Sequence, residues 1–197
     1  MAKGKLYVLS GPSGVGKDTV LASLSNIDHG FAICITATTR AMRPGEVDGR
    51  DYHFLSRESF LARRDAGEFL ESAEVHGNLY GTLKSEVTGR LSQGADVVMD
   101  LDVQGAAQVR NCADEAIRLS AIDLFVMPAS DEELYARLSG RGTDSAEVIA
   151  LRMTNALEEM RHWREYTYRL LSGSREEDYA RFRSLIAAER MRVSRLA

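Results

Sequence analysis

Apolar runs alternate with amphipathic stretches along most of the chain. Five apolar runs predict buried parallel strands, the last more weakly than the others: residues 6–9, 31–35, 95–99, 121–127 and 168–171. Apolar residues at helical spacing predict helices over residues 104–112, 131–139, 145–163 and 176–193. Strands that alternate with helices predict an α/β fold of three layers around a parallel five-stranded sheet.

Residues 37–92 interrupt this alternation. Pro-Gly and Asp-Gly turn signals separate short extended runs at residues 51–54 and 69–75, which flank one expected helix near residues 57–66. We interpret the segment as an inserted, partly antiparallel lobe. The core domain then consists of residues 1–36 and 93–197.

The first apolar run leads directly into a glycine-rich loop, Gly11-Pro12-Ser13-Gly14-Val15-Gly16-Lys17. Its glycines allow backbone N–H groups to turn inward and form a nest for an anion, because no Cβ atom obstructs them. The apolar residues that follow predict a helix whose positive N-terminus faces the same anion, and Lys17 adds a mobile positive charge. A strand, this loop and a helix in succession predict a triphosphate-binding site.

One position departs from the usual form of such loops. Asp18 follows the lysine, where a Ser or Thr that binds Mg²⁺ is usual, and Thr19 comes one place later. Asp18, Thr19 or a water between them could hold the metal ion, since carboxylate oxygens are suitable ligands for Mg²⁺. Asp18 could equally cap the N-terminus of the helix, where an acidic side chain is favoured.

Composition narrows the class of protein. The chain has 197 residues, 44% of them hydrophobic, which is enough for one well-buried core with small appended lobes. A formal net charge of -4 argues against bulk binding of nucleic acid or of a membrane surface, so basic residues must act locally. Cys34 and Cys112 lack metal-ligand spacing, which predicts reduced thiols. No signal peptide and no apolar stretch of about 18 residues is present, so we expect a cytoplasmic protein.

Polar and basic side chains concentrate in the inserted lobe. Arg40 and Arg43 offer forked guanidinium donors that suit a second phosphate group, and Tyr52 and Tyr80 offer hydroxyl donors without added charge. Any one of them taken singly is more commonly a surface arginine or a packed tyrosine. Their concentration in one lobe predicts a monophosphate-binding site.

Carboxylates lie at or near predicted strand ends, where open α/β sheets bind ligands: Glu71, Asp100 and Asp102. Asp100 ends a hydrophobic strand and could lie close to Mg²⁺ or its waters, or it could cap the helix that follows. Guanine presents two N–H donors side by side, which a carboxylate accepts, whereas adenine has a lone pair at the same edge. Two carboxylates together with Thr36 therefore favour guanine.

A polar, glycine-containing stretch at residues 139–144 predicts a second insertion, a short helical lid at about residues 139–150. Arg137 and Arg141 lie beside or within it, Arg152 follows one helix later, and all three would converge on the phosphates when the lid closes. Phosphoryl transfer between two polyanions needs several cations to offset repulsion and to stabilise charge on the transferred group. The chain would supply Lys17, Arg40, Arg43, Arg137, Arg141 and Arg152.

Almost the whole chain resembles the guanylate kinase family. The resemblance rests on the glycine-rich loop and on further groups of residues: Thr38-Thr39-Arg40, Arg43-Pro44-Gly45-Glu46, Asp51-Tyr52, Phe69-Leu70-Glu71, residues 77–82, residues 100–106 and residues 137–143. It implies a P-loop kinase fold with a GMP-binding lobe and a lid. It also implies a nucleoside monophosphate kinase that uses ATP and Mg²⁺ to convert GMP to GDP in purine nucleotide metabolism.

The same matching assigns residues to roles. The GMP-site positions are Thr36, Arg40, Arg43, Tyr52, Glu71, Tyr80, Thr82, Asp100 and Asp102. ATP binding falls to residues 11–17 with Asp18 and Thr19, and the metal to Asp18, Thr19 and Asp100. We expect Lys17, Arg40, Arg137, Arg141 and Arg152 to act in catalysis. The two nucleotides are the only partners implied, and the sequence does not distinguish a monomer from a homo-oligomer.

Two departures from the family pattern concern the donor nucleotide: Asp18, and residues 170–174 in place of an Asn-Asp-Asp-like segment that resembles an adenine contact. Two alternative functions stay open. Ribose-bisphosphate kinases resemble this family and often carry Asp after the lysine, but a sugar phosphate offers no guanine edge to the carboxylates. Guanylate-kinase-like binding modules have typically lost the glycine-rich loop, which is intact here.

Overall fold

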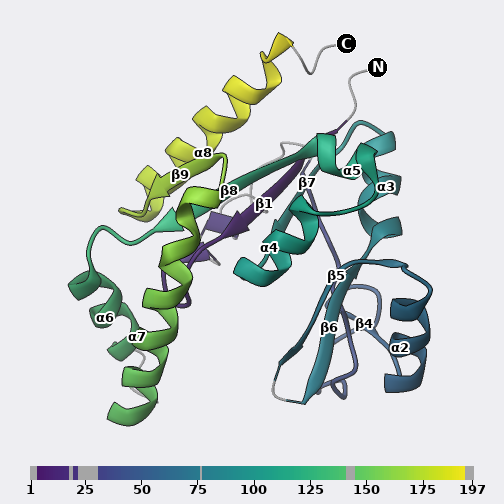
Figure 1. The fold of residues 1–197 in the computed structure, drawn as a ribbon, viewed down its shortest axis with the longest axis horizontal. Helices are drawn as coiled ribbons and strands as arrows, with labels where there is room; N and C mark the ends of the chain where they lie inside the picture. The colour runs from purple at the N-terminus through teal and green to yellow at the C-terminus, as the bar shows by residue number, and fades with distance from the viewer. Residues whose placement is uncertain (1–3, 18–19, 22–30, 76, 141–144, 194–197) are drawn as a thin grey trace.

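A parallel five-stranded sheet forms the centre of the computed structural model (Figure 1), which describes residues 4–17, 20–21, 31–75, 77–140 and 145–193. The strand order is β2 (Phe31–Ile33), β7 (Asp96–Asp100), β1 (Leu6–Ser10), β8 (Ala121–Met127) and β9 (Tyr168–Leu171). Leu9 of β1 lies opposite Asp100 of β7, so both strands end at the same edge of the sheet. The predicted α/β fold and its five-stranded parallel sheet are confirmed.

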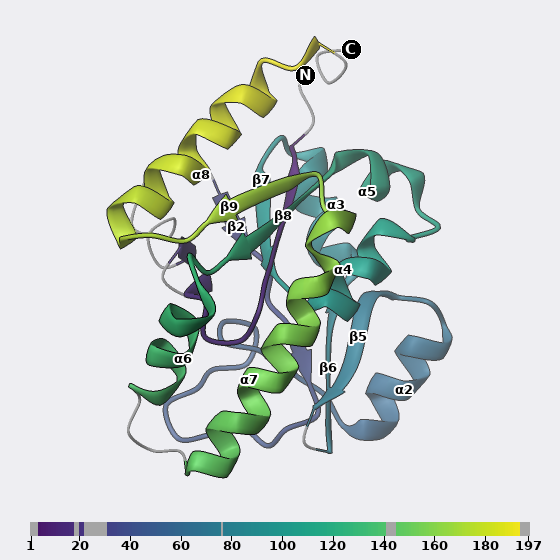
Figure 2. The same cartoon turned by 60° about the vertical axis from the view of Figure 1, so that its left-hand side comes forward.

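Helices cover both faces of this sheet because alternate strand residues point to opposite sides. Leu6 and Val8 face α3 (Lys84–Ser92), α4 (Val103–Arg110) and α5 (Glu115–Ser120). Tyr7 and Leu9 face α8 (Arg175–Arg190), which contributes buried Phe182. Figure 2 shows α8 on one side of the sheet and α3, α4 and α5 on the other, which gives three layers.

A second, four-stranded sheet lies at one end of the molecule, below the central sheet in Figure 1. Its order is β4 (His53–Phe54), β3 (Ala37–Thr38), β6 (Asn78–Leu83) and β5 (Phe69–Val75). The β5–β6 and β3–β6 pairs are antiparallel, whereas β3 and β4 run parallel. α2 (Arg57–Asp65) covers it by burying Phe60 against Phe69, whose rings stack 4.3 Å apart.

One side chain ties this second sheet to the core layers. The carboxamide of Gln108, on α4, accepts from Ser72 N at 3.0 Å and donates to Ser72 O at 3.1 Å. Ser72 lies on β5, the outer strand of the second sheet. The pair of hydrogen bonds therefore fixes the outer edge of β5 against α4.

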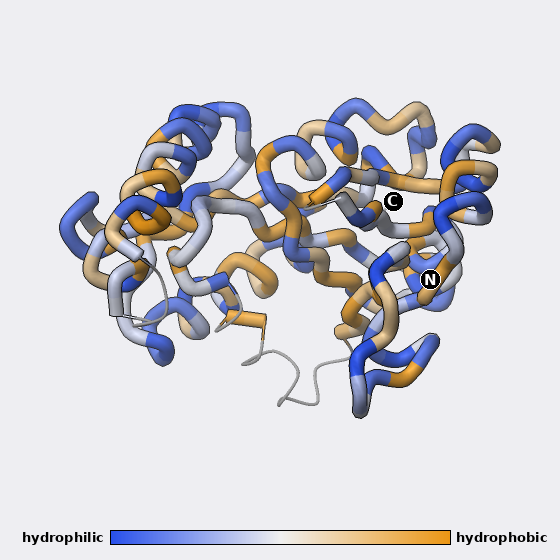
Figure 3. The backbone as a smooth tube through the Cα atoms, turned by 90° about the horizontal axis from the view of Figure 1, so that it is seen from below, coloured by the Kyte–Doolittle hydropathy of each residue, from blue (hydrophilic) through white to orange (hydrophobic). Residues whose placement is uncertain are grey.

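Two further helices pack against each other beside the central sheet (Figure 2). α6 (Asp131–Ser139) buries Leu134 and Leu138 against Ala156 of α7 (Ala146–Met160). Ser130 and Ser145 cap their N-termini by accepting backbone N–H groups, and a 3₁₀ turn, η1 (Arg161–Glu165), continues from α7. Figure 3 shows hydrophobic and hydrophilic stretches alternating along the helices, as expected of elements with one buried face. Within the described part of the chain, no helix is long and apolar enough to cross a bilayer.

Several elements differ from the sequence prediction. The strand expected at residues 31–35 ends at Ile33, and the helix expected over residues 145–163 divides into α7 and η1. α3 and α5 were not predicted. α3 has no side-chain cap at its start. α5 is capped by Asp114 but spans only 6 residues, too few to show a helical period.

Candidate active site

The glycine-rich loop connects β1 to a helical turn that includes Lys17, Val20 and Leu21. Gly11 and Gly14 have φ angles of +148° and +86°, a region that disfavours side chains. A Cβ atom on Gly11 would lie 2.4 Å from the Val126 carbonyl oxygen. The loop therefore packs tightly onto β8 with its backbone, and the two glycines are needed for that path.

Lys17 lies at the mouth of this loop, half-buried. Its Nζ donates to the Gly11 carbonyl at 2.6 Å and lies 4.0 Å from Asp100 Oδ1. The structure thus brings together the loop lysine and the acid at the end of β7, as their strand register requires. Asp18 and Thr19, the other predicted metal ligands, lie outside the described residues.

A hollow of about 460 Å³ opens in front of the loop. It is lined by the loop, by Lys17, Asp100 and Asp102, and by two side chains from α7, Arg152 and Glu159. Arg152 donates from Nη2 to Ser13 Oγ at 3.1 Å, and Ser13 N donates to Glu159 Oε2 at 3.2 Å. Arg152 therefore lines the hollow in front of the loop, while Arg141 falls outside the described residues.

Glu71 is the buried carboxylate of the second sheet. It is only 7% exposed on β5, and both the hydroxyl and the backbone N–H of Thr82 on β6 bond to it. Burial raises the pKa of the Glu71 carboxyl above its ordinary value, and the charge of Asp102 acts in the same direction, while the Thr82 hydrogen bonds oppose the shift. A buried acceptor held in this way is suited to bind N–H donors of a ligand.

Asp102 lines the hollow in front of the loop together with Glu159. Its charge raises the pKa of both Glu159 and Glu71. Its Oδ1 also accepts from Gly105 N at 2.7 Å, which caps the N-terminus of α4. The capping role considered for Asp100 thus belongs to Asp102, because α4 begins at Val103.

Arg40 and the two predicted tyrosines form one polar cluster of the lobe. Arg40 donates to Glu46 Oε1 at 2.7 Å, and its guanidinium lies 5.3 Å from the centre of the Tyr52 ring. Tyr52 and Tyr80 meet edge to face, 6.3 Å between ring centres. Glu46 also accepts from Arg43 N at 2.7 Å, although the Arg43 side chain is exposed. Thr36 is half-buried before β3, where its carbonyl accepts from His53 N.

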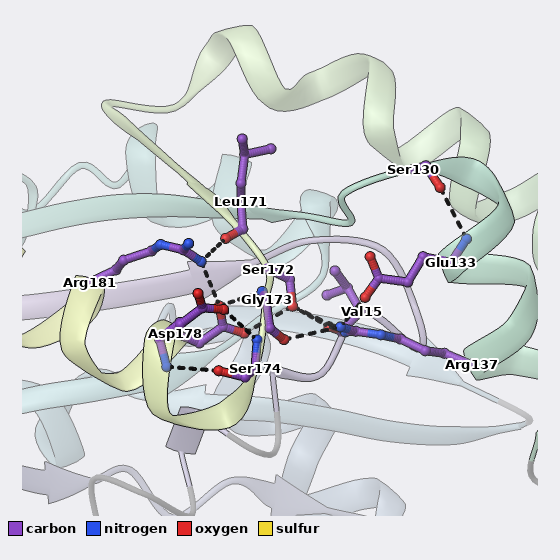
Figure 4. Close-up of polar contacts among 11 residues, drawn as sticks. Val15, Ser130, Glu133, Arg137, Leu171, Ser172, Gly173, Ser174, Asp178 and Arg181 are labelled. Carbon is purple, nitrogen blue, oxygen red and sulfur yellow. Dashed lines mark hydrogen bonds and ion pairs between the residues drawn. The ribbon is translucent and has the colours of Figure 1, made fainter.

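Arg137 occupies a second hollow of about 460 Å³ on the other side of the loop, away from Arg152. Its guanidinium donates to the Val15 carbonyl, to Glu133 and, at 3.1 Å, to Ser172 Oγ (Figure 4). Buried Asp178 accepts from Ser172 Oγ at 2.9 Å and from Gly173 N at 2.7 Å. Arg137 and Asp178 therefore join the loop, α6 and the start of α8 into one wall.

The sequence and the fold were compared with those of known proteins. The sequence profile described as guanylate kinase matches residues 3–189. A guanylate kinase of Hahella chejuensis is 44% identical over 194 residues, covering 98% of this chain and 91% of that protein. One from Vibrio cholerae serotype O1 is 42% identical over 199 residues, with 100% and 94% covered. The crystal structure of guanylate kinase from Anaplasma phagocytophilum aligns with a TM-score of 0.73 and 30% identity over 99% of this chain and 90% of that one.

The chain belongs to the guanylate kinase family. Guanylate kinases are ATP-dependent kinases of nucleoside monophosphates, and the function of this chain is that of a guanylate kinase. The predicted family, P-loop kinase fold and enzyme class are confirmed. The two alternatives left open by the sequence, a sugar-phosphate kinase and a non-catalytic module, find no support in these matches.

Sequence reasoning missed two residues of this guanylate kinase site, Glu159 and Asp178. Glu159 follows Arg152 by seven residues on one helix, so helical spacing places both on the same face. Asp178 lies in the first turn of α8. That position is typical of a residue that stabilises a helix, so its sequence gives no sign of the loop contacts it makes.

Proposed function

We propose that the chain transfers the γ-phosphoryl group of ATP to GMP, with the glycine-rich loop binding the donor phosphates and the lobe of residues 37–92 binding the acceptor. The observation that carries this proposal is that Asp102 lines the hollow in front of the loop and caps α4, and that α4 bonds through Gln108 to Ser72, the neighbour of Glu71 on β5. A guanine at Glu71 would therefore lie close to the phosphate hollow.

The acceptor base is bound through Glu71. The guanine N1–H and N2–H groups donate to its carboxylate, while Thr82 holds that carboxylate in place. Arg40, Arg43, Tyr52 and Tyr80 bind the acceptor phosphate with guanidinium and hydroxyl donors. Glu46 orients Arg40 and the Arg43 backbone for this task.

Lys17 and Arg152 act on the donor side. The Lys17 ammonium leaves the Gly11 carbonyl to contact the transferring phosphate, and Arg152 reaches it from α7. Arg137 acts from behind the loop instead, since its guanidinium holds the Val15 carbonyl in the wall of the second hollow. Positive charge at fixed positions stabilises the transition state because no reorganisation is needed when charge develops.

The residues present fit a magnesium ion. Asp100 offers a partly exposed carboxylate 4.0 Å from the Lys17 ammonium, and hard oxygen ligands of this kind suit Mg²⁺. Within the described residues no group of three acidic, histidine or cysteine side chains could hold a metal alone, which fits an ion that shares its ligands with phosphates and water. When bound, the ion offsets the charge of the phosphates. Asp18 and Thr19 are proposed as further ligands.

A coupled assay of ADP release tests the acceptor. GMP, AMP, UMP and ribose 1,5-bisphosphate are offered in parallel with ATP and Mg²⁺. Rapid turnover with GMP alone supports the proposal. Comparable turnover with ribose 1,5-bisphosphate, or none with any acceptor, contradicts it.

A further inference from the structure

Glu159 makes a contact that guanylate kinase activity does not explain. Its Oε2 accepts from the backbone N–H of Ser13 at 3.2 Å, inside the loop that we propose binds the donor phosphates. The side chain is half-buried and lines the same hollow as Lys17. The Glu159 carboxylate therefore accepts a backbone N–H group that would otherwise be available to a bound anion.

The surroundings of Glu159 are those of a bound anion. Burial raises the pKa of its carboxyl, while the Ser13 amide and the positive charge of Lys17 lower it. Asp102 is also near and adds a like charge. The Ser13 amide and Lys17 are the groups that would stabilise phosphate oxygens in a bound nucleotide. Glu159 therefore interacts with the same two groups that we propose for phosphate.

Arg152 strengthens the same contact from two turns earlier on α7. It donates to the Ser13 hydroxyl at 3.1 Å while Glu159 accepts from the Ser13 amide at 3.2 Å, so one residue of the loop bonds to two oppositely charged side chains of one helix. α7 is thereby attached to the loop at Ser13.

We propose that Glu159 is a positioning residue that competes with nucleotide phosphate for the Ser13 amide and couples phosphate binding to release of α7. One N–H group cannot donate fully to both acceptors, and a half-buried carboxylate repels an incoming polyphosphate. Phosphate must displace Glu159, and this frees α7 to bring Arg152 from Ser13 onto the phosphates. Displacing Glu159 costs free energy, so the loop binds ATP more weakly than it would without Glu159.

The test measures binding of inorganic tripolyphosphate and of ATP, by calorimetry without GMP, to the full chain and to Glu159→Gln and Glu159→Ala. Gln keeps the size and one acceptor oxygen but removes the charge, and Ala removes both. Tripolyphosphate should bind about tenfold more tightly to Glu159→Ala, with Glu159→Gln between it and the unmodified chain. The gain should shrink at high salt, because the repulsion is electrostatic.

Glu158→Gln is the matched control. Glu158 is the neighbouring residue on α7, is 63% exposed at its side chain and pairs with Arg161 at 2.8 Å, so the same charge is removed outside the hollow. Its affinity for tripolyphosphate should change less than twofold. Steady-state kinetics should show a lower KM for ATP in Glu159→Gln, which a loss of structure would not produce. Unchanged or weaker tripolyphosphate binding by Glu159→Gln, in protein with an unaltered melting temperature, overturns the proposal, as does an equal gain in Glu158→Gln.

Discussion

In the glycine-rich loop, the groups proposed to face an anion are backbone amides and one lysine, all within residues 11–17, whereas in the lobe they are side chains from separate strands and connecting segments. Backbone amides respond to negative charge and do not distinguish one base from another. The Glu71 carboxylate, fixed by Thr82, requires donors in a particular arrangement. Substrate selectivity should therefore reside in the lobe and rate acceleration in the loop, and substitutions in the two regions should separate these quantities.

The largest expected effect concerns the lobe. AMP should be phosphorylated with a kcat/KM up to ~10⁴-fold below that of GMP, because the Glu71 carboxylate would face the adenine N1 lone pair while desolvated. Parallel steady-state assays with the two nucleotides measure the ratio. A difference of less than tenfold would mean that the lobe does not read the base through Glu71.

The loop should show the next largest effect. Lys17→Ala should reduce kcat by about 10²-fold or more, since its charge acts mainly on the transition state. Lys84→Ala is the control: Lys84 donates to the Gly67 carbonyl at 2.7 Å, on the lobe side of the molecule, and its loss should leave kcat unchanged. Retention of normal kcat in Lys17→Ala would remove Lys17 from the catalytic machinery.

Glu71 should also give GMP use a distinctive pH dependence. Burial holds its folded-state pKa above the ordinary value of 4.5, and only the ionised carboxylate accepts both guanine donors. As pH falls through that raised pKa, kcat/KM for GMP should drop by about tenfold per pH unit, beginning above pH 4.5. Glu71→Gln should be slower and lack this acidic limb. An identical limb in Glu71→Gln would assign it to another group.

The raised pKa of Glu71 also determines how its contribution to stability changes with pH. A carboxyl whose folded-state pKa is raised stabilises the fold in its protonated form, and this contribution is lost as pH rises through the raised pKa. The unfolding free energy of Glu71→Gln, taken relative to that of the unmodified protein, should therefore be higher at neutral pH than at pH 4. Urea unfolding at the two pH values checks the direction.

Asp102 should produce the smallest effect, and it joins the two regions. Asp102→Ala should lower the free energy of unfolding by about 1 kcal/mol because α4 loses its N-cap. Asp102→Asn keeps a capping oxygen, so its stability should change little. The acidic limb of GMP use should still move to lower pH in Asp102→Asn, since a like charge near Glu71 is gone. A fixed limb would show that Asp102 serves only as a cap.

Local features were predicted well from sequence and distant contacts were not. The loop motif and the apolar runs of β1, β7, β8 and β9 are signals within a few residues, so they could be recognised before any fold was known. The contact between Ser13 and Glu159 joins residues 146 apart in sequence, so no pattern within a few residues indicates it. Arg137 and Arg152 flank one predicted lid, yet α6 and α7 place them in different hollows.

The carboxamide of Gln108 has a consequence for the behaviour of the protein at high concentration. The outer edge of β5 would otherwise present an unpaired peptide group at Ser72, and exposed strand edges recruit strands of other molecules. Gln108 offers Ser72 one acceptor and one donor, as a peptide of a neighbouring strand would. We therefore expect the Gln108 side chain to disfavour edge-to-edge pairing of the lobe with other molecules at Ser72.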